Sequence, residues 1–200
     1  MPPSPGRTQA GADIRPLMTP EEARLVLNEA DCLYTRDVVE QAIDDLAEVT
    51  ASALSHSDPL VLGVMNGGVV LLGGLLTRWS FPLQVDYLHA TRYRGATSGG
   101  EHLHWLARPQ TSMQERTVIV VDDILDGGVT LDGICGFCRE QGARQVVSIV
   151  LVNKANPERD PAITVDYAAL EAPNRYLFGY GMDYHDYLRN APGIFAVRGR

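Results

Sequence analysis

Cysteine is scarce in this sequence, and long apolar runs are missing. Cys32, Cys135 and Cys138 are the only cysteines among 200 residues, and an odd number cannot form a closed disulfide framework. The longest apolar stretches, 60–65 and 69–76, are much shorter than the roughly 20 residues that cross a bilayer. The first residues also lack the apolar core of a signal peptide. We therefore expect a cytoplasmic protein with no membrane partner.

Positive charge is scarce as well. The chain has 17 Lys and Arg residues against 25 Asp and Glu residues, a formal net charge of −8. Nonspecific binding to DNA or RNA depends on clustered Lys and Arg side chains, so we expect no nucleic-acid partner. Any anionic ligand has to be held by local groups instead. Hydrophobic residues make up 45% of the chain, which is enough for the core of one substantial domain.

Two of the cysteines form a C-x-x-C motif, which can indicate a redox site or half of a zinc site. A redox motif needs a reactive thiolate at the start of a helix. Cys135 and Cys138 instead lie within an apolar run, after an expected helix start at Thr130. No second cysteine pair completes a zinc site. We interpret both cysteines as buried thiols of the core.

The chain is expected to consist of an N-terminal arm and one domain. Residues 1–17 contain four prolines and few bulky side chains, so we predict a disordered arm followed by a single domain over residues 18–200. Thr19, followed by a proline and two glutamates, is typical of a helix start, and this helix should reach residue 30. Apolar residues at steps of three and four predict a longer helix over residues 35–55.

The middle of the chain is built from short runs that are apolar throughout. Such runs are typical of strands that helices cover on both faces. Helical patterns at 69–78 and 130–141 alternate with them, so the predicted fold class is α/β with a mainly parallel sheet flanked by helices. A segment rich in Gly, Thr and Ser at 92–101 is expected to be a long mobile loop. The predicted strands span residues 60–65, 83–89, 117–121, 146–152 and 163–170.

The strand at 117–121 runs directly into residues 122–130, with the sequence DDILDGGVT. In parallel sheets, ligands bind beyond the carboxyl ends of the strands. The two glycines permit a tight turn, and the amides of the following helix start point at an anion, together with the Thr130 hydroxyl. The segment therefore predicts a phosphate cradle. It differs from the P-loop and the Rossmann fingerprint in its glycine spacing and its missing lysine.

Three aspartates precede this cradle. Asp122 and Asp123 would repel a bare phosphate, but they can attract a divalent metal or accept hydrogen bonds from sugar hydroxyls. Asp126 lies next to the anion site and can act as a general base. The alternative interpretation is an ordinary strand-to-helix turn whose acids only cap the helix.

Residues 120–130 resemble the 5-phosphoribosyl-1-pyrophosphate (PRPP) signature of type I phosphoribosyltransferases. The chain from about residue 60 to residue 197 resembles the hypoxanthine-guanine phosphoribosyltransferase family, with four motifs in the family's order. The resemblance implies the type I phosphoribosyltransferase fold with a small base-binding hood. It also implies Mg²⁺-dependent purine salvage, in which PRPP and a 6-oxo purine, hypoxanthine or guanine, give IMP or GMP and pyrophosphate. A homodimer or homotetramer is implied as well.

The resemblance assigns roles to the PRPP signature. Asp122 and Asp123 would face the ribose hydroxyls and, with Asp183, contribute to the metal site. Asp126 would accept the N7 proton of the purine, which fits a carboxylate beside a developing oxocarbenium ion. The family has Thr where Gly127 stands, so one phosphate-binding hydroxyl is absent here. The residues expected to hold the 5′-phosphate are Asp126, Gly127, Gly128, Val129 and Thr130.

Two further motifs would bind pyrophosphate. Asn66 and Gly67 lie in a run, 62–68, that resembles the family's pyrophosphate loop, although the family commonly has Lys in place of Asn66. Arg189 would supply a cation to the leaving group. Taken alone, the run 62–68 would be interpreted as an ordinary strand-to-helix turn.

The remaining motifs would select the base. Lys154 would donate to the purine O6, because an ammonium has only donors and therefore favours a 6-oxo over a 6-amino purine. Tyr176 would stack on the purine ring, and Leu177 would offer backbone groups to its edge. Arg92 and Tyr93 align with the family's flexible catalytic loop, where Ser usually stands in place of Arg92.

Three alternatives to these assignments are considered. His102 and His104 alternate as on a strand and can suggest a metal pair, but we interpret them as a solvated strand face. A phosphoribosyltransferase that prefers xanthine fits Lys154 equally well. A regulatory protein that senses PRPP without catalysis and binds nucleic acid should have a basic surface and should have lost its catalytic acids. The net charge of −8 and the presence of Asp126 and Asp183 argue against it.

Overall fold

The computed structural model describes residues 18–92 and 103–199, and for Arg92 it describes the backbone only. The predicted disordered arm, Tyr93, His102 and most of the predicted mobile loop lie outside the described residues. No helix in the described ranges is both long enough and apolar enough to span a bilayer.

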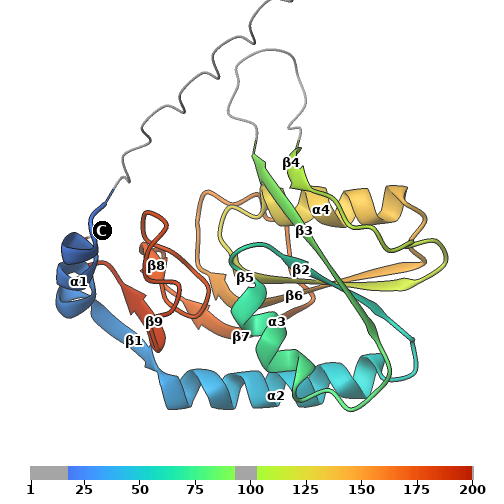
Figure 1. Ribbon diagram of the computed structural model, residues 1–200, viewed down its shortest axis with the longest axis horizontal. Coiled ribbons are helices and arrows are strands. Elements are labelled where there is room, and N and C mark those ends of the chain that lie inside the picture. The colour runs from blue at the N-terminus through green and yellow to red at the C-terminus, as the bar shows by residue number, and fades with distance from the viewer. Residues whose placement is uncertain (1–17, 93–102, 200) are drawn as a thin grey trace, which may run out of the picture.

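A six-stranded sheet forms the centre of the molecule (Figure 1), in the strand order β4-β3-β2-β5-β6-β7. Neighbouring strands pair in parallel, except that β4 runs antiparallel to β3. The prediction of a mainly parallel α/β sheet is therefore confirmed. The strands are β2 (Leu60–Val64), β3 (Gln84–Arg92), β4 (Leu103–Ala107), β5 (Thr117–Leu125), β6 (Gln145–Lys154) and β7 (Tyr167–Ala172).

Helices cover both faces of this sheet. In Figure 1, α2 (Arg36–Leu54) and α3 (Val69–Leu76) lie on one face and α4 (Val129–Glu140) lies on the other. The central strand β5 shows why residues 118–121 are apolar without interruption. Ile119 and Val121 belong to the cluster beneath α2 and α3, whereas Val118 and Val120 belong to the cluster beneath α4. Successive side chains of a strand point to opposite faces, so both faces of β5 require apolar residues.

A second, smaller sheet forms the hood that the resemblance implies. It is antiparallel, in the order β1-β9-β8, and contains β1 (Asp31–Thr35), β8 (Leu177–Phe178) and β9 (Gly193–Ala196). Helix α1 (Pro20–Glu29) precedes it. The Thr19 side chain caps α1, and the Glu22 carboxylate accepts from the Thr19 amide at 2.7 Å. This confirms the predicted helix start.

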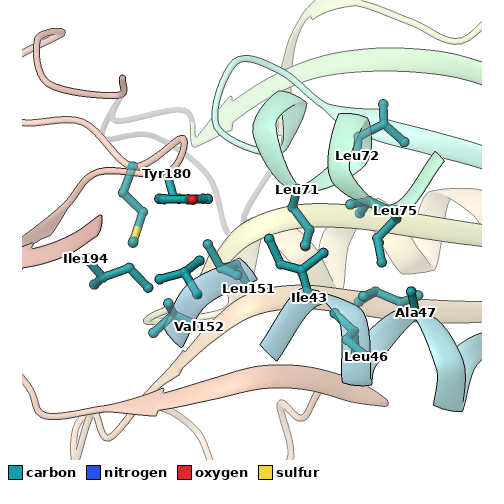
Figure 2. Close-up of a cluster of buried hydrophobic side chains, with 14 of the residues drawn as sticks. Ile43, Leu46, Ala47, Leu71, Leu72, Leu75, Leu151, Val152, Tyr180 and Ile194 are labelled. Atoms are coloured by element: carbon teal, nitrogen blue, oxygen red, sulfur yellow. The ribbon is translucent and has the colours of Figure 1, made fainter. Parts of the chain in front are cut away.

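The hood shares a core with the large sheet. Figure 2 shows Tyr180 and Ile194 of the hood beside Leu151 and Val152 of β6. The Tyr180 hydroxyl also donates to a Glu40 carboxylate oxygen on α2 at 2.8 Å. Burial of these apolar side chains and this hydrogen bond fix the hood against α2 and β6.

The structure moves several predicted boundaries. β5 and β6 continue to Leu125 and Lys154, and β7 begins at Tyr167 rather than at Ile163. Ile163 instead lies in a turn, where its amide donates to the Asp160 carbonyl at 2.9 Å. The apolar side chain of Ile163 is the reason for predicting it within the strand. In the structure this side chain packs beside Gly128, so an apolar residue is suited to the turn as well.

Cys135 and Cys138 are buried on α4, as predicted. Burial raises the pKa of the Cys135 thiol to about 11 and that of the Cys138 thiol to about 12, so neither is a reactive thiolate. His104 is exposed on β4. In the part of the chain that the structure describes, no three His, Cys, Asp or Glu side chains are grouped to hold a metal ion.

Candidate active site

A cleft of about 1230 Å³ lies at the carboxyl ends of the central strands. Its position follows from the topology, because the loops after parallel strands meet at one edge of a sheet. All residues of the predicted PRPP and pyrophosphate sites line it. These are Asn66, Gly67, Asp122, Asp123, Asp126, Gly127, Gly128, Val129, Thr130 and Arg189.

The turn between β5 and α4 has the geometry of an anion cradle. Gly128 adopts a φ of 76° at the N-cap of α4, and no side chain caps this end of the helix. A Cβ atom at Gly128 would also lie 2.4 Å from the Ile163 side chain. The amides of the first turn of α4 are therefore open toward the cleft, where the helix dipole favours negative charge.

Two adjacent carboxylates lie beside this cradle. Asp123 is buried and Asp122 is partly buried, and the Asp123 amide donates to an Asp122 carboxylate oxygen at 2.9 Å. Burial raises the pKa of both carboxyl groups, and the Asp123 charge raises that of Asp122 further. The nearby Arg189 guanidinium acts in the opposite direction. This pair would be stabilised in its charged form by hydroxyl donors or a cation.

Asp126 and Lys154 lie at the ends of adjacent strands and form an ion pair, with 2.8 Å between Lys154 Nζ and Asp126 Oδ2. The Asp126 side chain is 45% exposed, whereas that of Lys154 is 10% exposed. The predicted base and the predicted O6 donor are thus in direct contact, and Asp126 faces the cleft. A ligand that engages both groups has to contact the end of β5 and the end of β6.

The loop after β2 approaches the carboxylate pair closely. A Cβ atom on Gly67 would lie 2.0 Å from Asp123 Oδ2, so this position admits only glycine without rearrangement. The Gly68 amide donates to the Val64 carbonyl at 2.9 Å. Asn66 is exposed and follows a cis peptide bond. The predicted pyrophosphate loop and the predicted ribose site therefore share one wall of the cleft.

Arg189 connects this wall to the hood. It donates to the Gly181 carbonyl at 2.7 Å, and a second nitrogen lies 2.7 Å from Asp183 Oδ1. The other Asp183 oxygen accepts from the Asp186 amide at 2.9 Å. Asp183 is therefore held by Arg189, and it lies near enough to the carboxylate pair for its charge to raise the pKa of Asp123.

The predicted base-binding residues of the hood lie outside the wall of the cleft. The Tyr176 ring is half-exposed and packs edge-on against Tyr184, with 5.0 Å between ring centroids. Burial and the Asp183 charge raise the pKa of Tyr176. Leu177 is buried and pairs with Ala196 of β9. Tyr176 has exposed surface that a planar ligand can cover, and the Leu177 side chain contributes to the core that the hood shares with the large sheet.

Other residues line the cleft without having been predicted. Asn156 follows β6, and its Nδ2 donates to Asp126 Oδ1 at 2.7 Å. His89 and Thr91 of β3 also line the cleft, as do Glu158 and Asp160. The rule that ligands bind beyond strand ends would have selected Asn156, because it comes two residues after β6. No sequence pattern marked His89 or Thr91 as site residues, because their place in the cleft depends on the pairing of β3 with β2.

Comparisons with known proteins place this chain in a family. The model of the phosphoribosyl transferase domain family matches residues 30–185. A hypoxanthine-guanine phosphoribosyltransferase from Bacillus subtilis is 25% identical over 83% of this chain and 92% of its own length. A hypoxanthine-guanine-xanthine phosphoribosyltransferase from Tritrichomonas foetus is 29% identical over 81% of this chain and 88% of its own. The chain spans only 25% of the bifunctional protein TilS/HprT from Listeria innocua, to which it is 28% identical.

Solved structures of phosphoribosyltransferases have the same fold as this chain. A hypoxanthine-guanine-xanthine phosphoribosyltransferase superposes with a TM-score of 0.77 at 25% identity, covering 85% of this chain and 98% of that one. A hypoxanthine phosphoribosyltransferase from Staphylococcus aureus shares the fold, with a TM-score of 0.80 at 21% identity over 87% of this chain and 95% of its own. The chain belongs to the phosphoribosyl transferase domain family.

Proposed function

We propose that this protein is a purine salvage enzyme that transfers the 5-phosphoribosyl group from PRPP to hypoxanthine or guanine, giving IMP or GMP and pyrophosphate. The observation that carries the proposal is the contact between Asp126 and Lys154 beside an open helix start. It combines a proton acceptor, a donor for an oxo group and an anion site at one edge of the sheet. The names of the relatives from Bacillus subtilis and Tritrichomonas foetus support the same activity.

In this proposal the cradle holds the 5′-phosphate. Gly127, Gly128 and Val129 supply backbone amides, and Thr130 supplies a hydroxyl. Asp122 and Asp123 accept hydrogen bonds from the ribose hydroxyls, which relieves the repulsion between their charges. Gly127 stands where a phosphate-binding Thr is usual, so the backbone carries more of the binding here.

Base recognition would depend on the end of β6 and on the hood. Lys154 leaves its ion pair with Asp126 in part and donates a hydrogen bond to the purine O6. A 6-amino purine has a donor at this position and cannot accept that hydrogen bond. Tyr176 covers the ring with its exposed face. Asp126 accepts the N7 proton as N9 attacks C1′, and its charge stabilises the cationic centre.

The pyrophosphate end would be bound by the loop at Asn66 and Gly67 and by Arg189. The donor set fits Mg²⁺, because this ion binds in proteins through one or two carboxylates together with substrate phosphates and water. One or two of the carboxylates of Asp183, Asp122 and Asp123 would hold it, and pyrophosphate oxygens and water would complete its ligands. When bound, the ion neutralises charge on the leaving pyrophosphate. Arg189 already pairs with Asp183, so it can orient this carboxylate while it contacts the leaving group.

The partners in this proposal are PRPP and a 6-oxo purine, in a cytoplasmic enzyme that forms a homodimer or homotetramer.

The test is to incubate the protein with PRPP, Mg²⁺ and each of hypoxanthine, guanine, xanthine and adenine, and to measure nucleotide formation. We expect turnover with hypoxanthine or guanine and none with adenine. Turnover with xanthine above both would identify the xanthine enzyme instead. PRPP binding without turnover on any base would favour the regulatory protein, and neither binding nor turnover would reject the proposal.

A further inference from the structure

Asn156 forms the second contact to the Asp126 carboxylate. Its Nδ2 donates to Asp126 Oδ1 at 2.7 Å, while Lys154 Nζ lies 2.8 Å from Asp126 Oδ2. Each carboxylate oxygen therefore has its own donor. When Lys154 turns toward a base, Asn156 is the contact that still fixes the rotation of the carboxylate.

The orientation of the Asn156 amide is itself fixed. Its Oδ1 accepts from the Glu158 amide at 2.9 Å, and its backbone amide donates to the Lys154 carbonyl at 2.8 Å. The side-chain oxygen is thus engaged within the loop, and the nitrogen faces Asp126. A flipped amide would leave Glu158 without its acceptor and would place an oxygen against a carboxylate.

The loop that carries Asn156 is tied to both strand ends by Arg159. One Arg159 nitrogen lies 3.0 Å from the Leu125 carbonyl, 3.3 Å from the Asp126 carbonyl and 3.2 Å from the Lys154 carbonyl. The ends of β5 and β6 are therefore held together on the side where Asn156 reaches across. Movement of this loop away from Asp126 would break all of these hydrogen bonds.

We propose that Asn156 is a positioning residue that fixes the Asp126 carboxylate for proton acceptance. The inference rests on the proposed function, since it assumes that Asp126 takes the N7 proton. The Asp126 side chain is 45% exposed, so water would compete for an oxygen that lacked a protein donor, and the carboxylate would turn. A misplaced catalytic group lowers the rate of the chemical step more than it lowers substrate binding.

The test variant is Asn156→Asp, with Asn156→Gln as the matched control. Asn156→Asp keeps the acceptor for the Glu158 amide but removes the donor to Asp126, and Asn156→Gln keeps a donor. We expect kcat to fall at least about tenfold in Asn156→Asp, because a charge-assisted hydrogen bond is lost and a second carboxylate then faces Asp126. KM for PRPP should change little, because Asn156 contacts none of the cradle amides. Asn156→Gln should recover most of kcat, and a Gln variant as slow as the Asp variant would overturn the proposal.

Coupling to Asp126 separates positioning from a merely structural role. The loss caused by Asn156→Asp should disappear when Asp126 is already Asn, because the two changes then act on one step. An equal loss in both backgrounds would overturn the inference about Asn156. An Asp126→Asn variant with unchanged kcat would instead overturn the role of Asp126 in the proposed function.

A spectroscopic readout is independent of turnover. The side-chain amide resonances of Asn156, identified by their loss in Asn156→Asp, should shift when Asp126 is changed to Asn, while the rest of the spectrum stays folded. Unchanged Asn156 resonances in Asp126→Asn would show that the contact is absent, and would overturn the inference whether or not the protein turns over purines.

Discussion

The ammonium of Lys154 lies 2.8 Å from a carboxylate oxygen of Asp126, across the ends of two neighbouring strands. The residues are 28 positions apart in the chain, and the parallel pairing of β5 and β6 brings them together. A single ion pair thereby links the group that we expect to accept a proton to the group that we expect to recognise the purine oxygen.

This ion pair predicts the effect of replacing Lys154. Lys154→Met should leave Asp126 without its cationic partner and the purine O6 without its donor. We expect kcat/KM for hypoxanthine to fall about tenfold to a hundredfold, the range for losing a hydrogen bond to a charged group. Steady-state kinetics with hypoxanthine and adenine measure this. A Lys154→Met variant that keeps its preference for hypoxanthine over adenine would contradict the assigned role.

Gly67 provides a steric prediction. In Gly67→Ala the new methyl group would lie 2.0 Å from Asp123 Oδ2, so the loop or the carboxylate pair has to move. We expect kcat/KM for PRPP to fall at least about tenfold, because displacement of a binding group by even 1 Å is costly.

Gly73 offers the matched control for this substitution. It is exposed inside α3, and a Cβ atom there would meet nothing within 4 Å. Gly73→Ala should therefore keep full activity and raise the free energy of unfolding by about 0.5–1 kcal/mol. A loss of activity in both variants would indicate that the helix, rather than the cleft wall, is sensitive.

The contacts of Glu40 allow a prediction of how the stability of the protein depends on pH. Its carboxylate accepts from the Tyr180 hydroxyl at 2.8 Å and from Arg78 at 2.8 Å. The hydrogen bond from Tyr180, followed by that from Arg78, lowers the pKa of Glu40. A lowered pKa in the folded state adds stability above the ordinary glutamate pKa of about 4.3, and this stability is lost as the pH falls.

We therefore expect Glu40→Gln to reduce the free energy of unfolding at pH 7 by about 1 kcal/mol. The effect is small because the Glu40 side chain is partly exposed and water screens its charge. The difference from the wild type should shrink as the pH falls below about 4.3. Urea unfolding at several pH values measures it. A difference that stays constant between pH 7 and pH 3 would mean that the Glu40 charge is not responsible.

The three cysteines predict a simple pattern of thiol reactivity. Cys32 is exposed, whereas Cys135 and Cys138 are buried with pKa values raised to about 11 and about 12. Because only a thiolate reacts with an aromatic disulfide reagent, one thiol should react rapidly in the native protein at pH 8. Cys32→Ser should abolish this phase, and all remaining thiols should react after unfolding in denaturant. Two or more fast thiols in the native protein would contradict the buried environment on α4.

The sequence alone was sufficient to predict the elements that are formed by consecutive residues of the chain. The helix start at Thr19, the strand at 117–121 and the turn at 127–130 could all be recognised because neighbouring residues make the structure. The same applies to the buried cysteines, which lie in an apolar stretch of one helix. Local hydrogen bonds and the periodicity of apolar residues determine such features.

Short strands of the hood could not be recognised in this way. β8 has two residues and β9 has four, so neither carries a repeating pattern. They exist as strands because β9 pairs with β1, which lies more than 150 residues earlier. Ile163 was assigned to a strand for the opposite reason, since an apolar residue that packs on a turn looks like one that belongs to a sheet.

The contacts that organise the cleft depend on the order of the strands. β5 lies between β2 and β6, so Gly67, Asp123 and Lys154 meet around it although the chain separates them widely. Asn156 reaches Asp126 for the same reason. Residue types and motif spacing therefore indicated the candidate chemical groups and the family, because each motif consists of residues that are close together in the sequence. Which oxygen each group faces was decided by the folded sheet, because close contacts between distant segments arise only when the whole core has packed.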